Sequence, residues 1–292
     1  MRVLVTGISG QVGGALMKTA APTGITLIGA GRDKLDLSRP EGIAEAVSAI
    51  APDLVVNPAA YTAVDQAETE RDLAMMVNRD GPAALAAVCA ALGVGLIHLS
   101  TDYVFDGSGS RPYQPNDPIA PLGVYGASKE AGEAVIRDRL EDHLILRTAW
   151  VYAVEGKNFV NTMLRVGAQR DELKVVADQH GTPTAAEDIA AAILAIISAR
   201  STGSKVAGTH HYTASGATTW HGLAEAVFAR AEPVWGRRPL VQAIPSSEYP
   251  TPAARPAYSV LDNSSLDKAV AVPRRNWRAA ADATVGLILA RA

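Results

Sequence analysis

The chain has 292 residues, of which 48% are hydrophobic and 20% charged, a composition that supports a sizeable core and excludes a disordered chain. Its formal net charge of −3 gives no basic surface for nucleic acid, and no stretch reaches the ~20 apolar residues that a membrane span requires. The single cysteine, Cys89, excludes a disulfide framework, and we expect a small buried thiol in a cytoplasmic protein.

Short apolar runs rich in β-branched residues alternate with longer stretches of helical spacing. The predicted strands are 2–5, 25–30, 53–57, 95–100 and 143–147, and the predicted helices are 11–20, 40–50, 73–92 and 125–140. The strands lack the alternation of a half-exposed strand, which favours parallel strands covered on both faces. Strand followed by helix, repeated, predicts an α/β fold with a Rossmann-like, doubly wound parallel sheet.

A glycine-rich turn follows the first predicted strand directly. Gly7, Gly10 and Gly13 have the spacing G-x-x-G-x-x-G between a strand and a helix. Glycine at these positions allows a tight turn and a close approach of the backbone to a pyrophosphate. The free amides at the start of the helix favour the negative charge. The turn therefore predicts a dinucleotide-binding site, although a plain strand–helix turn has the same sequence requirements.

The second predicted strand ends at Gly31 and Arg32. Folds that prefer NAD usually place an acidic residue here for the ribose 2′-hydroxyl, whereas an arginine suits a 2′-phosphate because its planar fork matches phosphate bidentately. Arg32 therefore predicts NADPH as the cofactor and leaves the use of NADH open; the alternative is a solvated loop arginine. Asp36 and Leu37 follow a few residues on, where we expect the chain to contact the adenine.

Tyr125 and Lys129 stand four residues apart, on one face of a predicted helix. A free tyrosine has a pKa of about 10, so proton transfer near neutral pH needs help, and a nearby cation lowers that pKa. Thr101 stands at the carboxyl end of the fourth predicted strand, the edge where doubly wound sheets bind ligands. We predict that these three side chains are the catalytic group, against the alternatives of a surface pair and a loop-fixing threonine.

The regularity of the pattern fades after about residue 150. Residues 185–199 read as one apolar helix with Glu187 and Asp188 in its first turn, and proline becomes frequent between 239 and 256. We expect 1–150 to form a dinucleotide-binding Rossmann domain and 151–292 to form mainly a smaller C-terminal α/β lobe for the substrate. Whether the helix at 188–199 returns to the first domain stays open.

The motifs together resemble one family. The glycine turn, the run Ser100 to Gly107 and the spacing Tyr125-Gly126-x-x-Lys129 are similar to the dTDP-4-dehydrorhamnose reductases, within the extended short-chain dehydrogenase/reductase superfamily. Further segments share the likeness almost end to end: 57–65 with Glu68, 147–152, 158–160, 178–184 and 249–256.

The resemblance implies the last step of dTDP-L-rhamnose synthesis, in which NADPH reduces the 4-keto group of dTDP-4-dehydro-β-L-rhamnose and Tyr125 donates the proton. It also implies a set of binding residues: Gly10, Gln11 and Val12 at the cofactor phosphates, Ala60, Tyr61 and Thr62 beside the cofactor, and Thr101, Asp102, Trp150 and Arg255 at the nucleotide sugar.

Two features depart from the family's pattern. Some members dimerise through magnesium held by glutamates of both chains, but here the first-helix position is Ala15 and residues 290–292 offer no carboxylate side chain. Glu187 alone makes a poor magnesium site. We therefore predict no metal site and a monomer rather than a magnesium-linked dimer. His180 also stands where the family usually has an aromatic ring.

Two other functions stay open on the same residues. A reductase or epimerase of another nucleotide-linked deoxysugar would share the fold and the Tyr125–Lys129 pair, and only substrate profiling would separate it. A non-catalytic regulatory subunit, like the β subunit of methionine adenosyltransferase, shares the fold as well. The intact Tyr125, Lys129 and Thr101 argue against that reading.

Overall fold

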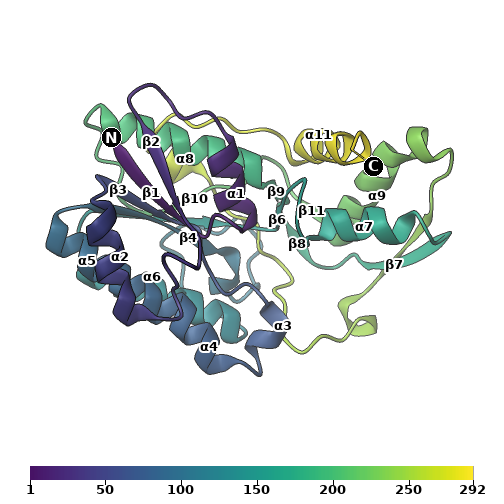
Figure 1. The fold of residues 1–292 in the computed structure, drawn as a ribbon. Helices are drawn as coiled ribbons and strands as arrows, with labels where there is room; N and C mark the ends of the chain where they lie inside the picture. The colour runs from purple at the N-terminus through teal and green to yellow at the C-terminus, as the bar shows by residue number, and fades with distance from the viewer. Residues whose placement is uncertain (292) are drawn as a thin grey trace.

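The computed structural model describes residues 1–291, and its larger lobe is built on a six-stranded, all-parallel sheet (Figure 1). The strand order is β10-β5-β4-β3-β1-β2. The chain builds the sheet outward from β1, first to β2 on one side and then to β3, β4, β5 and β10 on the other. The carboxyl ends of β1 and β3 therefore flank the point where a doubly wound sheet binds its ligand. The strands are β1 (Arg2–Thr6), β2 (Thr26–Ala30), β3 (Leu54–Asn57), β4 (Gly95–Thr101), β5 (His143–Thr148) and β10 (Gly208–His211).

The predicted Rossmann-like, doubly wound parallel sheet is confirmed. The five predicted strands agree with β1 to β5 to within one residue at each end. The sixth strand, β10, was not predicted. It lies at the edge of the sheet, and three of its four residues are only half-buried, so it lacks the apolar run that marks a central strand.

Helices cover both faces of the sheet. On one face α1 (Gln11–Lys18) packs against α8 (Ala186–Ser201), whose isoleucines join the strands in one apolar cluster. On the other face lie α2 (Ile43–Ile50), α5 (Gly81–Leu92) and α6 (Val124–Arg139), with a second cluster that contains the buried Cys89. The helix predicted at 185–199 thus packs on the sheet of the first lobe, beside α1 (Figure 1).

The predicted helix at 73–92 is interrupted. It comprises α4 (Arg71–Met75), a π-helical turn η2 (Met76–Asp80) and α5. Pro82 has no N–H to donate to the carbonyl of Asn78 one turn earlier, which favours a bulge at this point. Gly132 of α6 packs on that carbonyl, where a Cβ atom would overlap it. The π-turn therefore lets α6 approach closely.

The second lobe, at the right of Figure 1, has its own apolar cluster of helix and strand residues. Its helices are α7 (Phe159–Gly167), α9 (Trp220–Trp235) and α11 (Trp277–Leu289), and its parallel strand pair is β7 (Glu172–Val176) with β12 (Leu240–Ile244). Short strand pairs connect it to the sheet lobe: β6 (Val151–Tyr152) with β9 (Thr184–Ala185), and β8 (His180–Gly181) with β11 (Thr218–Thr219).

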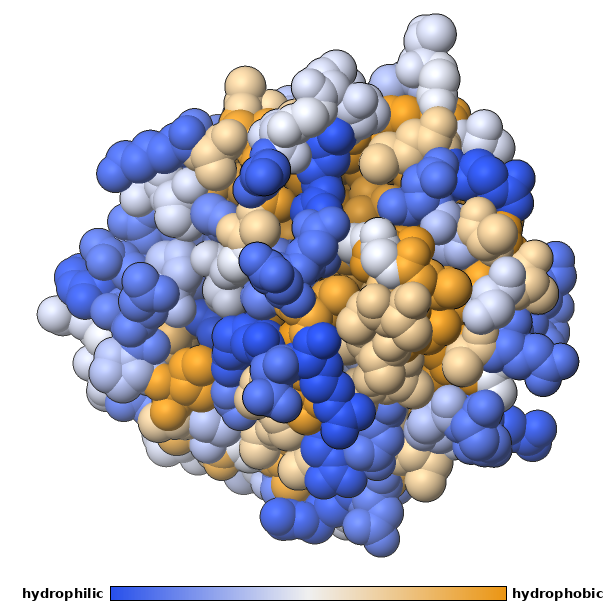
Figure 2. Space-filling view, turned by 90° about the vertical axis from the view of Figure 1, so that its left-hand side faces the viewer, coloured by the Kyte–Doolittle hydropathy of each residue, from blue (hydrophilic) through white to orange (hydrophobic). Residues whose placement is uncertain are grey.

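The remaining elements are short: α3 (Val64–Ala67), α10 (Ser264–Ala269) and the 3-10 turns η1 (Pro40–Gly42), η3 (Asp102–Val104) and η4 (Ser246–Glu248). Figure 2 shows that hydrophilic and hydrophobic side chains are interspersed over the face at the left of Figure 1, as helices that bury only one side produce. Within residues 1–291, every helix is too short or too polar to span a bilayer.

Candidate active site

The glycine turn joins β1 to α1 at the switch point of the sheet. Gly7 has a φ of 56°, in the left-handed region, and its carbonyl accepts a hydrogen bond of 2.9 Å from the amide of Gly10. A Cβ atom at Gly13 would overlap the Gly7 carbonyl, so α1 can approach the turn only with glycine there. No side chain caps the start of α1, which leaves its first amides free for an anion.

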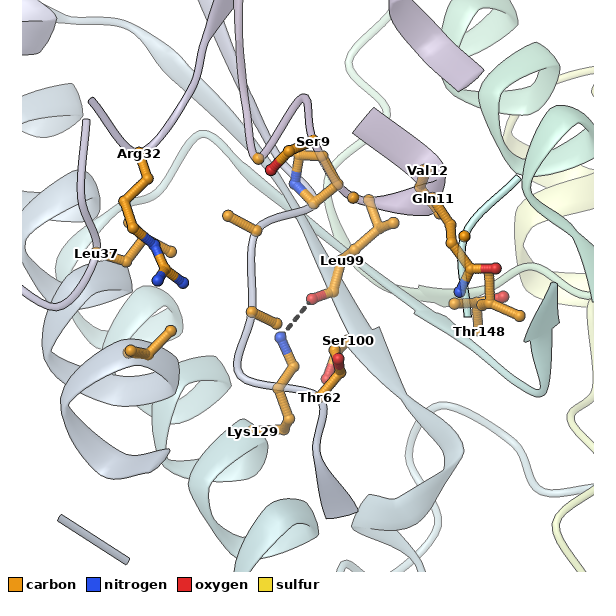
Figure 3. A pocket seen from close by; sticks show the side chains of 18 of the residues that line it. Ser9, Gln11, Val12, Arg32, Leu37, Thr62, Leu99, Ser100, Lys129 and Thr148 are labelled. Atoms are coloured by element: carbon orange, nitrogen blue, oxygen red, sulfur yellow. Dashed lines mark hydrogen bonds between the residues drawn. The ribbon is translucent and has the colours of Figure 1, made fainter. Parts of the chain in front are cut away.

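A cavity of about 420 Å³ opens in front of this turn. Arg32 and Leu37 lie at one end of it, Gln11 and Thr148 at the other, and Lys129 between them (Figure 3). It is lined by eleven of the residues that the sequence analysis assigned to the cofactor: Gly7, Gly10, Gln11, Val12, Arg32, Asp36, Leu37, Ala60, Thr62, Tyr125 and Lys129.

Two assigned residues do not line the cavity. Gly13 lies behind the turn, and Tyr61 turns its hydroxyl outward to Glu70, at 2.7 Å. The backbone of Tyr61, rather than its side chain, is held at the cavity. Its N–H and C=O both bond to the buried side chain of Asn78, at 2.8 and 3.0 Å. Asn78 comes from the π-turn η2 and holds the 60–62 loop against the cavity. The sequence offered no signal for it, since the bulge itself was not predicted.

The cavity also has lining residues that the sequence analysis did not name. Thr148, at the end of β5, has a buried hydroxyl without a hydrogen-bond partner among residues 1–291, which suits a polar ligand. Lys157, from the loop before α7, brings a cation from the second lobe. A dinucleotide with its phosphates on the glycine turn fits these residues. The sequence gives one indication of this role for Lys157: it directly precedes Asn158, the first residue of a segment that resembles the family.

Tyr125 lies in the first turn of α6 and borders the cavity. Burial raises the pKa of Tyr125 to about 12, and the nearby hydroxyl of Thr101 opposes that rise only in part. The phenol is therefore protonated near neutral pH. The pKa shifts upward, against the lowering expected from the sequence, because burial dominates and the charge of Asp102 adds to it. Gly126 lets α6 pack on the backbone of Tyr103, where a Cβ would overlap the carbonyl.

Lys129 lies one turn further along α6 and is 2% exposed. Its ammonium donates a hydrogen bond of 2.7 Å to the carbonyl of Leu99 on β4, and lies 3.3 Å from Nε2 of His98. Burial lowers the pKa of Lys129 to about 8, and the charge of Glu133 opposes this shift. The ammonium of this lining residue thus points toward β4, as the dashed line to Leu99 in Figure 3 shows.

Thr101 and Asp102 lie where β4 ends and η3 begins, both buried. The Thr101 hydroxyl donates to Asp102 Oδ1 at 3.0 Å and accepts from the amide of Tyr103 at 3.2 Å. Burial raises the pKa of Asp102 to about 6. Thr101 and Tyr125 are therefore brought together by the structure, and Thr101 also fixes its own loop.

A second cavity, of about 320 Å³, lies in the smaller lobe and has Arg255 in its wall. Trp220 lines it too, and stacks on Trp150 with ring centroids 3.6 Å apart. Trp150 has a φ of 47°, and a Cβ at Gly181 would contact its indole ring, so the glycine makes room for the stack. His180 is exposed beside it. Trp150 itself borders neither cavity.

Across residues 1–291, no three His, Cys, Asp or Glu side chains are grouped as metal ligands. The expected absence of a metal and the expected monomer stay predictions.

Comparisons with known proteins agree on one family. The model of the RmlD substrate binding domain matches residues 1–288. The chain is 44% identical over 286 residues to a dTDP-4-dehydrorhamnose reductase of Burkholderia thailandensis, with 95% of this chain and 96% of that protein covered. It is 42% identical over 284 residues to the dTDP-4-dehydrorhamnose reductase of Escherichia coli K12, with 95% of each chain covered.

Two solved structures are similar over the whole chain. A dTDP-4-dehydrorhamnose reductase from Clostridium acetobutylicum superimposes with a TM-score of 0.92 at 35% identity, with 99% of each chain covered. A dTDP-4-dehydrorhamnose reductase from Bacillus anthracis, solved in complex with NADP, has a TM-score of 0.88 at 32% identity, with 100% of this chain and 99% of that chain covered.

Proposed function

We propose a function for this chain on the premise that it belongs to the dTDP-4-dehydrorhamnose reductase family: it is an NADP-dependent oxidoreductase that reduces the 4-keto group of dTDP-4-dehydro-β-L-rhamnose to give dTDP-L-rhamnose. The observation that carries the proposal is the placement of Tyr125, Lys129 and Thr101 around the end of β4, beside a cavity that starts at a glycine turn.

NADPH would lie along the first cavity and, when bound, supplies the hydride. The free amides of α1 would face its pyrophosphate, and Arg32 at the far end would provide a cation for the 2′-phosphate. Asp36 and Leu37 would contact the adenine end, while Ala60 and Thr62 border the middle of the cavity. The preference for NADPH over NADH depends on Arg32.

Tyr125 would donate the proton to the oxygen of the reduced ketone. A donor must hold its proton until negative charge develops, and the raised pKa of Tyr125, about 12, meets this requirement at neutral pH. The Thr101 hydroxyl near Tyr125 supports a shared site for the ketone oxygen. Its single proton points to Asp102 Oδ1 in the structure and would turn to the ketone oxygen when the substrate binds. Lys129 would hold the nicotinamide ribose and stabilise the phenolate that remains.

The nucleotide end of the substrate would occupy the second cavity. Phe159, Trp220 and Tyr249 offer aromatic faces for a base, and Lys174 and Arg255 offer cations for a diphosphate. Asp102 and Trp150 would meet the sugar between the two cavities. This division, with a dinucleotide on the sheet and a nucleotide sugar on the second lobe, supports a nucleotide-linked substrate rather than a free sugar.

The test is to supply the protein with NADPH and enzymatically made dTDP-4-dehydro-β-L-rhamnose, to follow the loss of NADPH absorbance, and to identify the sugar by NMR. We expect one NADP released for each dTDP-L-rhamnose formed. A product that is inverted but not reduced would indicate an epimerase. Lack of NADPH oxidation with every keto sugar tried would favour a regulatory subunit and contradict the proposal.

A further inference from the structure

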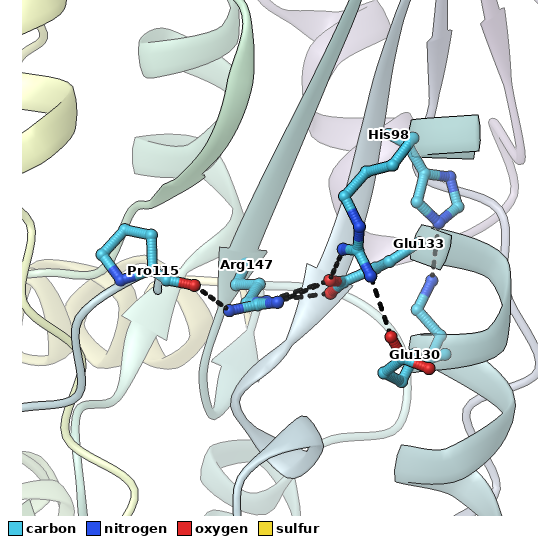
Figure 4. Close-up of polar contacts among 7 residues, drawn as sticks. His98, Pro115, Glu130, Glu133 and Arg147 are labelled. Atoms are coloured by element: carbon cyan, nitrogen blue, oxygen red, sulfur yellow. Dashed lines mark hydrogen bonds and ion pairs between the residues drawn. The ribbon is translucent and has the colours of Figure 1, made fainter. Parts of the chain in front are cut away.

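A row of buried polar side chains runs from Lys129 across the neighbouring strands of the sheet. Lys129 Nζ lies 3.3 Å from His98 Nε2, as the dashed line at the His98 ring in Figure 4 shows, and His98 Nδ1 lies 2.9 Å from the Asn57 amide. In the structure the Thr6 hydroxyl donates a hydrogen bond of 2.5 Å to Asn57 Oδ1, and it is Asn57 Nδ2 that faces His98 Nδ1. These residues belong to α6, β4, β3 and β1, and none is more than 2% exposed.

His98 is a neutral imidazole in this environment. Burial, and then the charge of Lys129, hold its pKa well below the ordinary value. A neutral imidazole has one N–H donor and one acceptor nitrogen, so the two sides of the ring must face groups of opposite character. The identity of the group at Nε2 therefore determines what Nδ1 requires.

The ammonium of Lys129 can only donate. Facing it, Nε2 must accept, the ring proton must sit on Nδ1, and Asn57 must present its amide oxygen. The amide nitrogen of Asn57 then donates to the Thr6 hydroxyl. This arrangement turns the Asn57 amide over relative to the structure, where Nδ2 faces His98 Nδ1 and Oδ1 accepts from the Thr6 hydroxyl. The two ends of an asparagine amide occupy nearly the same positions, so the exchange requires only that the 2.5 Å contact with Thr6 lengthen to the distance of an N–H···O bond. The reverse arrangement, with an N–H at Nε2, is compatible only with a neutral lysine amine.

We propose that His98 is a positioning residue for the reduction: it accepts a hydrogen bond from the Lys129 ammonium, and the ring proton held by Asn57 keeps it in the tautomer that can do so. This inference rests on the proposed function, in which Lys129 acts as a cation under the cofactor. His98 itself does not line the cavity, so it acts through Lys129.

The other groups near Lys129 offer little negative charge to stabilise its ammonium, so the contribution of His98 matters. Glu133, on the same face of α6, is bound to Arg147 of β5 at 2.6 and 2.9 Å and to Arg137 at 2.9 Å (Figure 4), so its charge is largely neutralised. Tyr125, one turn earlier on α6, is protonated near neutral pH. From β4 only Leu99 and His98 face the ammonium among residues 1–291. Loss of the His98 acceptor should therefore lower the pKa of Lys129 below about 8.

Two amide variants separate the two sides of the ring. In His98→Gln the amide reaches the position of Nε2, so its oxygen can still accept from Lys129. In His98→Asn the shorter amide reaches only the position of Nδ1, so it can bond to Asn57 but leaves Lys129 without that acceptor. The measurement is the pH profile of kcat/KM for NADPH oxidation, together with thermal unfolding of the cofactor-free protein over the same pH range.

We expect the alkaline limb of the profile to stay at the wild-type pH in His98→Gln and to move down by about one pH unit in His98→Asn, since a hydrogen bond to a charged group is worth about that much. Unfolding should show the same difference without any substrate. With the folded-state pKa lowered and the unfolded one unchanged, His98→Asn loses stability only where Lys129 is an ammonium. Its melting temperature should therefore fall below that of His98→Gln near about pH 7, and the gap should close above about pH 9.

Equal shifts in both variants, or a shift in neither, would show that His98 only fills space and would overturn the inference. If His98→Asn does not fold, Asn57→Asp provides the test instead. A carboxylate at Nδ1 favours the tautomer with its proton on Nδ1, so the alkaline limb of the pH profile should move upward. An unmoved or lowered limb there overturns the inference. If wild-type protein oxidises no NADPH, the proposed function fails, whereas the pH-dependent melting gap still tests the role of His98.

Discussion

Arg255 and Asp65 form a bidentate ion pair between segments 190 residues apart, with guanidinium–carboxylate distances of 2.9 and 2.8 Å. Asp65 belongs to α3 of the sheet lobe, whereas Arg255 lies in the C-terminal segment and borders the second cavity. The pair therefore ties the wall of the second cavity to the first lobe. The guanidinium keeps N–H groups free beyond these bonds and the one to the carbonyl of Ala253, so it can still donate to a diphosphate.

A double-mutant cycle separates the contribution of the Arg255–Asp65 ion pair to stability from the contribution of Arg255 to substrate binding. Because the side chains are 22% and 41% exposed, we expect a coupling of no more than about 1 kcal/mol between Asp65→Ala and Arg255→Ala in urea unfolding. If Arg255 binds the diphosphate, Arg255→Ala should raise KM for the nucleotide sugar about tenfold more than Asp65→Ala does. Equal effects on KM would mean that the arginine serves only the ion pair.

Replacing the hydroxyl of Tyr125 tests the proton donor. Tyr125→Phe should lower kcat by about 10²- to 10⁴-fold and leave the affinity for NADPH unchanged, because only the proton transfer is removed. Tyr103→Phe is the matched control, since its ring packs edge-on against that of Tyr125 at 5.6 Å and is similarly buried. Steady-state kinetics and fluorescence titration with NADPH give both quantities. Near-full turnover in Tyr125→Phe would assign the proton to another group.

The charge of Arg32 should determine the choice between NADPH and NADH. Arg32→Ala is expected to raise KM for NADPH by about tenfold to about a hundredfold, the value of a charge-assisted contact to phosphate, and to change KM for NADH little. Lys34→Ala, two residues on and outside the cavity, provides the control for a general loss of positive charge. If both cofactors weaken equally, the arginine supports the loop rather than the 2′-phosphate.

Asp102 should destabilise the folded protein when it is ionised. Its pKa is raised from 3.8 to about 6, so the folded state holds a proton more tightly than the unfolded state between these values. Asp102→Asn should therefore raise stability by about 3 kcal/mol above about pH 7, and the gain should vanish as the pH falls to about 4. Asp102→Asn should also weaken binding of the nucleotide sugar, which a higher KM would show.

Asp106→Asn is the control of opposite sign, because hydrogen bonds from Ser108 lower the pKa of that carboxyl group. It should reduce the melting temperature near neutral pH. A loss of stability in both variants at pH 7 would indicate that Asp102 is compensated by groups near it.

Gly126 should be required for the position of α6. Because a Cβ there would overlap the carbonyl of Tyr103, Gly126→Ala should destabilise the protein by about 1–3 kcal/mol and displace Tyr125 and Lys129, with a fall in kcat. Gly42→Ala is the matched control, since its Cβ would meet no atom and its φ is negative. It should be neutral or slightly stabilising. Denaturant unfolding compares the two, and equal stabilities would refute the packing argument.

The sequence by itself determined the parallel sheet, the glycine turn at Gly7, the position of Arg32 after β2 and the shared helix face of Tyr125 and Lys129. Each of these depends on residues close together in the chain, where side-chain periodicity and the conformational needs of glycine act directly. The family likeness added Gln11 and Ala60 to the expected cofactor site and Asp102 to the expected substrate site.

Only the tertiary structure decided the partners of these side chains. The edge strand β10, the packing of α8 on α1, the contact of Asn78 with the 60–62 loop and the Arg255–Asp65 pair all depend on segments that are distant in sequence. The direction of a pKa shift depends on them too, because burial is produced by the whole fold. That is why Tyr125, expected to be acidified by Lys129, is instead held protonated.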